Sequence, residues 1–337
     1  MSKKLIETNE ISPEAKASMK TRIITALVLT ALCVPCLFLG GWFFFALSVI
    51  ISIFVSYELV HVLSLKTRFK YIIYIASIVI LLAFVYWIFI KNNIGNSDIS
   101  ASTVLTIGFS NLLVSTVLIL VTAGVFFGIS FICEEFSPSK VCYLISMIVI
   151  VGLCIQSFLY LRFAPTKIFI EKLDGFDVST PLFKYFQSSL LLVYVILGTI
   201  LNDIGAYFFG ILFGKHKLNP RISPKKTWEG FYGGMIISFA FTVAFALIMS
   251  AVGLPLLPFL DVQHFYWVLL ISAVMPIIAN LGDFTFSAIK RSFGIKDFSK
   301  LLPGHGGVLD RIDSLLFVGG FVSIMVIFIN NGWDFFK

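Results

Sequence analysis

Long apolar segments recur along the whole chain, and they constrain its fold more than any other feature of the sequence. Each segment holds about 20 residues, the length that an α-helix needs to cross the hydrocarbon core of a bilayer. The composition agrees, because 58% of the 337 residues are hydrophobic and only 13% are charged. A soluble domain is nearer one half apolar and one quarter charged. The sequence therefore predicts an all-α polytopic membrane protein.

Charged stretches and helix-breaking residues divide the apolar sequence into about nine candidate transmembrane helices. Lysine and arginine concentrate in cytoplasmic loops, so their distribution predicts the orientation. A cytoplasmic N-terminus and an outside C-terminus place 19 of the 25 lysines and arginines on the cytoplasmic side. The expected spans are 23–40, 42–60, 71–90, 112–133, 141–161, 188–213, 231–252, 265–288 and 313–330.

The charge pattern also predicts how the chain is organised. Residues 1–22 are expected to form a polar cytoplasmic tail, and residues 23–187 an N-terminal transmembrane region. Residues 188–337 are expected to form a C-terminal transmembrane region. This last part contains the two most basic cytoplasmic loops, 214–230 and 289–312.

The net charge of +7 follows largely from this topology. Basic cytoplasmic loops attract the anionic headgroups of membrane lipids, so we expect no nucleic-acid partner. On the opposite side, 162–187 is interpreted as a solvated or interfacial loop. Glu58 lies near the inner end of the second span. A charged side chain at that depth can reach water, so we favour a structural role for it.

Ionisable residues inside the spans are the main functional candidates, because burying them in a membrane is costly. Asp203 and Asp283 interrupt two spans that run directly into the basic loops. Asp283 and Lys290 share one helix face, and so do Asp310 and Asp313. Converging carboxylates suggest a site for Mg²⁺, which usually takes one or two protein carboxylates and completes its shell with water and phosphate oxygens. The alternative is a set of hydrogen bonds or a buried ion pair that stabilises the helix bundle.

The loop 214–230 offers cations and free N–H groups for phosphates. Within "SPKKTWEG" we interpret Ser223 as a helix N-cap and Pro224 as the first helical residue. The N–H groups of that helix start would then face an anion. Four glycines bracket the segment and favour an anion site over a plain basic loop. They are Gly214, Gly230, Gly233 and Gly234.

The loop 289–312 contains the sequence "PGHGG" immediately before the last span. Its glycines allow positive φ angles and close approach of the backbone to a ligand. His305, between the glycines, can form a hydrogen bond with a phosphate. The glycine-rich motifs of P-loop and dinucleotide-binding proteins are missing from the sequence.

Two stretches resemble the phosphatidate cytidylyltransferase family, also called CDP-diacylglycerol synthases. One is "SAIKRSFGIKDFSKLLPGHGGVLDRID", residues 287–313, which matches the family signature throughout. The other is "DIGAYFFGILFGKHKLNPRISPKKTWEGFYGG", residues 203–234. The resemblance implies a nucleotidyltransferase of phospholipid biosynthesis that converts CTP and phosphatidic acid to CDP-diacylglycerol and pyrophosphate. It also implies Mg²⁺ as cofactor, with a second cation left open.

The resemblance implies roles for individual residues as well. The expected catalytic residues are Asp283, Lys290, Asp310 and Asp313, and the three aspartates are also the expected metal ligands. The expected substrate-binding residues are Asp203, Ser223, Lys225, Lys226, Arg291, His305, Gly306, Gly307 and Arg311.

The expected partners are CTP, phosphatidic acid and membrane lipids, with a homodimer left open. Modest length and a short N-terminal tail favour a bacterial inner membrane over the endoplasmic reticulum, with the active site facing the cytoplasm. Three alternatives remain. They are a CTP-dependent lipid kinase of the dolichol or phytol type, a cation transporter, and a scaffold that keeps the motif without the activity.

Overall fold

The computed structural model describes residues 13–332, except 67, 94–100 and 174. Within this part of the chain, nine helices are long and apolar enough to cross a membrane. The predicted all-α polytopic fold is confirmed. The helices are α1 (Pro13–Leu39), α2 (Gly41–Val62), α3 (Phe69–Asn93), α4 (Ala101–Ile132), α5 (Pro138–Lys172), α6 (Leu190–Leu212), α7 (Trp228–Ala251), α8 (Phe265–Ser292) and α9 (Leu309–Asn331).

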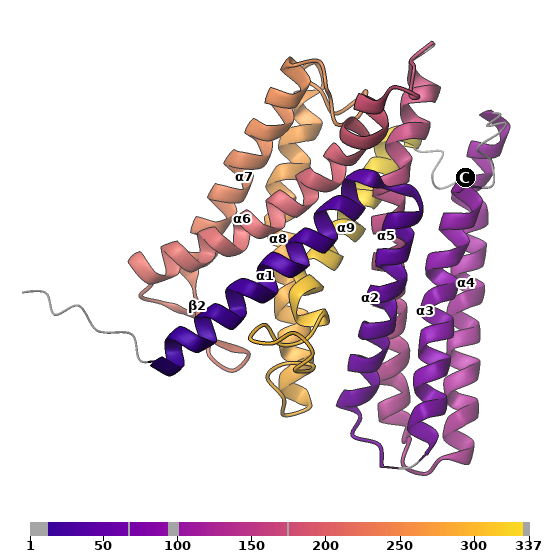
Figure 1. The fold of residues 1–337 in the computed structure, drawn as a ribbon, viewed down its shortest axis with the longest axis vertical. Helices are drawn as coiled ribbons and strands as arrows, with labels where there is room; N and C mark the ends of the chain where they lie inside the picture. The colour runs from indigo at the N-terminus through magenta and orange to yellow at the C-terminus, as the bar shows by residue number, and fades with distance from the viewer. Residues whose placement is uncertain (1–12, 67, 94–100, 174, 333–337) are drawn as a thin grey trace, which may run out of the picture.

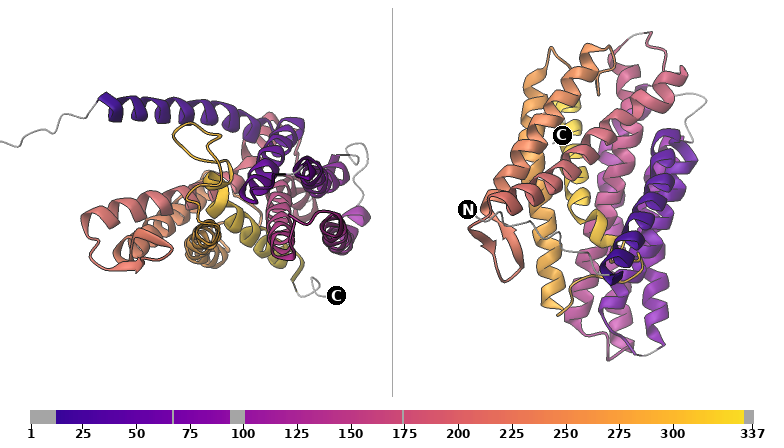
Figure 2. Two further views of the ribbon diagram at one scale, coloured as in Figure 1. Left: turned by 90° about the horizontal axis from the view of Figure 1, so that it is seen from below. Right: turned by 60° about the vertical axis from the view of Figure 1, so that its left-hand side comes forward.

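The helices form two groups that meet along α5 and α9. Helices α2 to α5 stand side by side as one bundle, and α6 and α7 lie inclined to it as a closely packed pair (Figure 1). Helix α9 packs against both α5 and α8, so it joins the bundle to the second group. Helix α1 lies apart from α6 and α7, with the α8–α9 loop reaching toward it (Figure 2).

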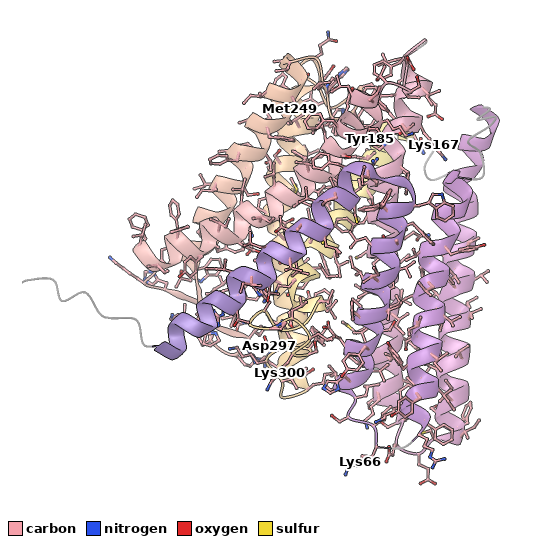
Figure 3. All side chains as sticks on the ribbon, in the orientation of Figure 1. Lys66, Lys167, Tyr185, Met249, Asp297 and Lys300 are labelled. Carbon is pink, nitrogen blue, oxygen red and sulfur yellow. The ribbon has the colours of Figure 1, made fainter. Side chains whose placement is uncertain are left out.

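The connecting segments gather at the two ends of the molecule. Lys66, Asp297 and Lys300 lie at one end, whereas Lys167, Tyr185 and Met249 lie at the other (Figure 3). The loop after α2 and the loop before α9 therefore share an end, as the alternation of spans predicts.

One predicted boundary is refined and another is wrong. Helix α1 begins at Pro13, so 13–22 of the predicted tail are helical, whereas 1–12 lie outside the described residues. The candidate membrane span within α1 begins at Thr21, close to the predicted start at 23. Proline suits a first helical position, and the alanines and charged residues that follow favour helix. Helix α5 continues through 162–172 into the predicted outer loop. Burial of Ile168 and Phe169 in the core stabilises this extension.

The predicted helix start at Ser223 is also wrong. Ser223 begins strand β2 (Ser223–Thr227), which pairs antiparallel with β1 (Lys217–Asn219). The Asn219 side chain accepts hydrogen bonds from two backbone N–H groups of the turn, and such a turn reverses the chain. Thr227 is the N-cap of α7, and its hydroxyl accepts a hydrogen bond from the Gly230 N–H at 3.2 Å.

Gly230 and Gly234 of α7 allow close packing against α6. A Cβ atom at Gly234 would lie 2.5 Å from the Asn202 carbonyl oxygen of α6, and one at Gly230 would lie 2.6 Å from the Ala206 carbonyl. Small residues at these positions let the two helix backbones approach closely, as is typical of helix pairs in membranes. Close packing of α6 on α7 holds Asp203 and the β-hairpin in one place.

Candidate active site

Asp283 of α8 pairs with Lys226 of strand β2. Lys226 Nζ donates to Asp283 Oδ2, and the Ser287 hydroxyl donates to Oδ1 at 3.1 Å. Both members of the ion pair keep about a quarter of their side chains exposed. The pair joins the β-hairpin to α8, and ligands can still reach it.

Lys290, one turn further along α8 from Ser287, pairs with two carboxylates of α9. Its Nζ lies 2.7 Å from Asp310 Oδ1 and 3.8 Å from Asp313 Oδ2. The side chain of Lys290 is 10% exposed and that of Asp310 is 2% exposed. Lys290, an expected catalytic residue, is therefore the counter-ion of two predicted metal ligands in this structure.

The second oxygen of Asp310 holds the loop before α9. Asp310 Oδ2 accepts hydrogen bonds from the backbone N–H groups of Phe298 and Gly307, each at 2.9 Å. Both oxygens of this carboxylate thus have protein donors. Asp310 fits a role in fixing the loop, and its role as a metal ligand stays a prediction.

Carboxylates from α6, α8 and α9 lie near one another. Asp203, Asp283 and Asp313 are close enough to repel one another electrostatically. Within the described part of the chain, no three histidine, cysteine, aspartate or glutamate side chains are grouped tightly enough to hold a metal by themselves. Mg²⁺ needs only one or two protein carboxylates when phosphate and water complete its shell. These aspartates fit an ion that binds together with a phosphorylated ligand.

A cavity of about 380 Å³ opens beside Asp203 and Asp283. Lys225 and Lys226 of β2 contribute its cations, and Tyr207 contributes an aromatic side chain. Buried Asn280 donates a hydrogen bond to Asn202 Oδ1 at 3.2 Å and so fixes α8 against α6 at the edge of this cavity. Acidic and basic groups predicted separately from the sequence meet here.

A second cavity, of about 650 Å³, is lined by the α8–α9 loop and by α1. Its cationic side chains are Arg22, Lys296, Lys300 and Arg311, and His305 also lines it. Asp297 is its acidic side chain, and both Asp297 and Lys300 lie near α1 in Figure 3. This cavity has the charge that an anionic ligand requires. We call it the basic cavity.

Two predicted substrate-binding residues make other contacts in this structure. Arg291 donates to the Ile222 carbonyl at 3.3 Å and to the Ile295 carbonyl at 3.0 Å, so it ties the β-hairpin to the α8–α9 loop. Ser223 lies in β2 opposite Asn219. Neither contact was evident from the sequence.

Glu58 does not reach water as expected, although its contacts agree with the structural role predicted for it. Glu58 is completely buried, and it accepts hydrogen bonds from residues of the α8–α9 loop and the start of α9. Arg22 and Asn280 are further site residues that sequence reasoning missed. An acidic residue inside a span was the only sequence signal for Glu58.

Comparison with known families agrees with these features. Residues 20–329 match the model of the cytidylyltransferase family. The chain belongs to the cytidylyltransferase family. The match covers all nine described helices in whole or in part, and it confirms the resemblance carried by the two motifs.

Several curated relatives are phosphatidate cytidylyltransferases. The protein of that name from Staphylococcus haemolyticus is 46% identical over 137 residues, which are 40% of this chain and 48% of that protein. Its namesake in Staphylococcus epidermidis is 45% identical over 128 residues, 38% of this chain and 45% of that protein. The protein of the same name from Staphylococcus aureus is 43% identical over 137 residues, which are 40% of this chain and 48% of that protein. The chain thus spans about half the length of these relatives.

Proposed function

We propose that this protein is a phosphatidate cytidylyltransferase, which makes CDP-diacylglycerol and pyrophosphate from CTP and phosphatidic acid. The observation that carries the proposal is the pairing of Asp283 with Lys226 and of Lys290 with Asp310, which joins aspartates to cations of the two basic loops. Family membership and the names of the relatives support the same activity.

The reaction suits a site without a strong general base. An ionised oxygen of the lipid phosphate attacks the α-phosphorus of CTP, a new P–O bond forms, and the bond to the β-phosphate breaks. The leaving group carries its electron pair away as pyrophosphate. Such a reaction depends mainly on positioning and on neutralising charge at the phosphates.

The residues around the first cavity would bind the phosphates and the metal ion for this reaction. Lys225 and Lys226 are placed to bind phosphate oxygens from the β-hairpin side. Asp283 and Asp313, with Asp203 beside them, would hold Mg²⁺, which when bound neutralises charge on the triphosphate. Lys226 would exchange its bond to Asp283 for a phosphate oxygen when both substrates are present.

The basic cavity is suited to the nucleotide, which arrives from water. Its lining combines four cationic side chains with His305 and Gly306 of the α8–α9 loop. The lipid phosphate would reach Asp283 from the bilayer, since that residue lies on a membrane-spanning helix. We propose that the site faces the cytoplasm of a bacterial plasma membrane, an orientation supported by the basic charge of both loops.

The position of the ³²P label in CTP tests the proposed reaction directly, because it shows which phosphate is transferred to the lipid. The purified protein, with phosphatidic acid and Mg²⁺, is given either [α-³²P]CTP or [γ-³²P]CTP, and the lipid is extracted. We expect α-label in the lipid and γ-label in pyrophosphate. A lipid kinase would instead put γ-label in the lipid and leave the α-label in CDP, because it transfers the γ-phosphoryl group. A transporter or scaffold would label no lipid from either nucleotide. Either of these results would contradict the proposal.

A further inference from the structure

Glu58 lies where α2 meets the beginning of α9. Its Oε1 accepts hydrogen bonds from the Ser299 hydroxyl and from the Val308 N–H, both at 2.7 Å. Its Oε2 accepts from the Leu309 N–H at 2.8 Å. The side chain is completely buried, so three donors from one short region replace its water.

These bonds supply a cap that α9 lacks in its own sequence. Val308 occupies the N-cap position and has no side-chain acceptor. The free N–H groups at a helix start favour a negative charge. Glu58 provides that charge from a helix about 250 positions earlier in the chain.

Glu58 and Asp310 together hold the two ends of the 298–309 loop close to each other. Asp310 binds the N–H groups of Phe298 and Gly307, while Glu58 binds Ser299 and the first residues of α9. Each carboxylate therefore bridges the two sides of 298–309. The residues between these anchors include Lys300 and line the basic cavity.

The close approach of Glu58 explains one glycine of the motif. A Cβ atom at Gly307 would lie 2.5 Å from Glu58 Oε1, too close for a real contact. Gly307 was predicted to contact substrate. In the structure it leaves room for the Glu58 carboxylate beside the loop.

We infer that Glu58 is a positioning residue, which holds the 298–309 loop in the shape that binds the nucleotide's phosphates. The inference rests on the proposed function for its kinetic consequence, but its structural consequence can be measured without any activity. It also gives the N-terminal bundle a part in the site, because α2 belongs to that bundle.

The test uses Glu58→Gln, with Glu134→Gln as the matched control on an exposed glutamate of the α4–α5 loop. Glutamine keeps the size but loses one acceptor oxygen and turns an NH₂ group toward N–H donors. We expect the KM for CTP to rise at least tenfold, with kcat and the KM for phosphatidic acid changing less than threefold. We also expect the Val308 and Leu309 amides to exchange hydrogen at least tenfold faster, with α5 unchanged.

A second variant keeps the test decisive if Glu58→Gln does not fold. Ser299→Ala removes one of the three bonds without changing the buried charge, and we expect the same effects at about threefold. Wild-type KM and wild-type amide exchange in a folded variant would overturn the inference. A wild-type protein that transfers no α-label would instead refute the proposed function, and the exchange rates would still judge the role of Glu58.

Discussion

Replacing Lys290 with methionine would leave two carboxylates of α9 without their cation. The ammonium lies 2.7 Å from Asp310 and 3.8 Å from Asp313, and the side chains of Lys290 and Asp310 are at least nine-tenths buried. Removing one partner of a buried ion pair typically costs about 3–5 kcal/mol, because the other charge stays buried. We expect Lys290→Met to lose about this much free energy of unfolding.

A double-mutant cycle separates the ion pair from simple loss of packing. Asp310→Asn should also destabilise the protein, but Lys290→Met combined with Asp310→Asn should be more stable than the sum of the single changes by about 2 kcal/mol. The assay is equilibrium unfolding of the purified protein in mixed detergent micelles. Lys215→Met, on an exposed lysine, is the control and should change stability by less than about 0.5 kcal/mol. Additive single costs, or a Lys290→Met protein as stable as the wild type, would refute this reasoning.

Three further substitutions test how the helices pack. Gly234→Ala should destabilise the protein by about 1–3 kcal/mol, because its Cβ meets the α6 backbone. Gly128→Ala, where a Cβ meets nothing within 4 Å, should be neutral or stabilising in the same unfolding assay, and equal effects would contradict the α6–α7 contact. Arg162→Met should cost about 2 kcal/mol, because Arg162 donates to the Leu37 and Phe38 carbonyls at the end of α1. An unchanged unfolding midpoint would contradict a stabilising role for these two hydrogen bonds.

The helices could be predicted because each span is defined by its own composition. A run of about 20 apolar residues requires no knowledge of the rest of the chain. The ends of the helices were less predictable, since they depend on tertiary contacts. Helix α5 continues to Lys172 because it packs in the core, and β2 replaces a helix start because the Asn219 turn pairs two strands. Local propensity does not contain this information.

The candidate site was predictable in composition and only partly in geometry. Acidic residues inside spans and basic residues in loops identified Asp283 and Lys226 separately. Their pairing across 57 positions depends on how the β-hairpin folds back onto α8. The burial of Glu58 was not predicted for the same reason, because its partners lie about 240 positions or more away. Burial and long-range donors decide the role of such a residue, and the sequence alone records neither.

Transfer of α-label from [α-³²P]CTP to phosphatidic acid by Asp283→Asn tests the central claim most directly. Asp283 joins α8 to the β-hairpin and faces the aspartates of α6 and α9. Removing one preorganised electrostatic contact from an active site typically lowers the rate about 10²–10³-fold. Asp261→Asn, in the α7–α8 connection, is the control and should retain at least half of the wild-type rate. The account predicts a fall of at least 100-fold for Asp283→Asn with an unchanged unfolding midpoint, and a rate equal to the control's would contradict it.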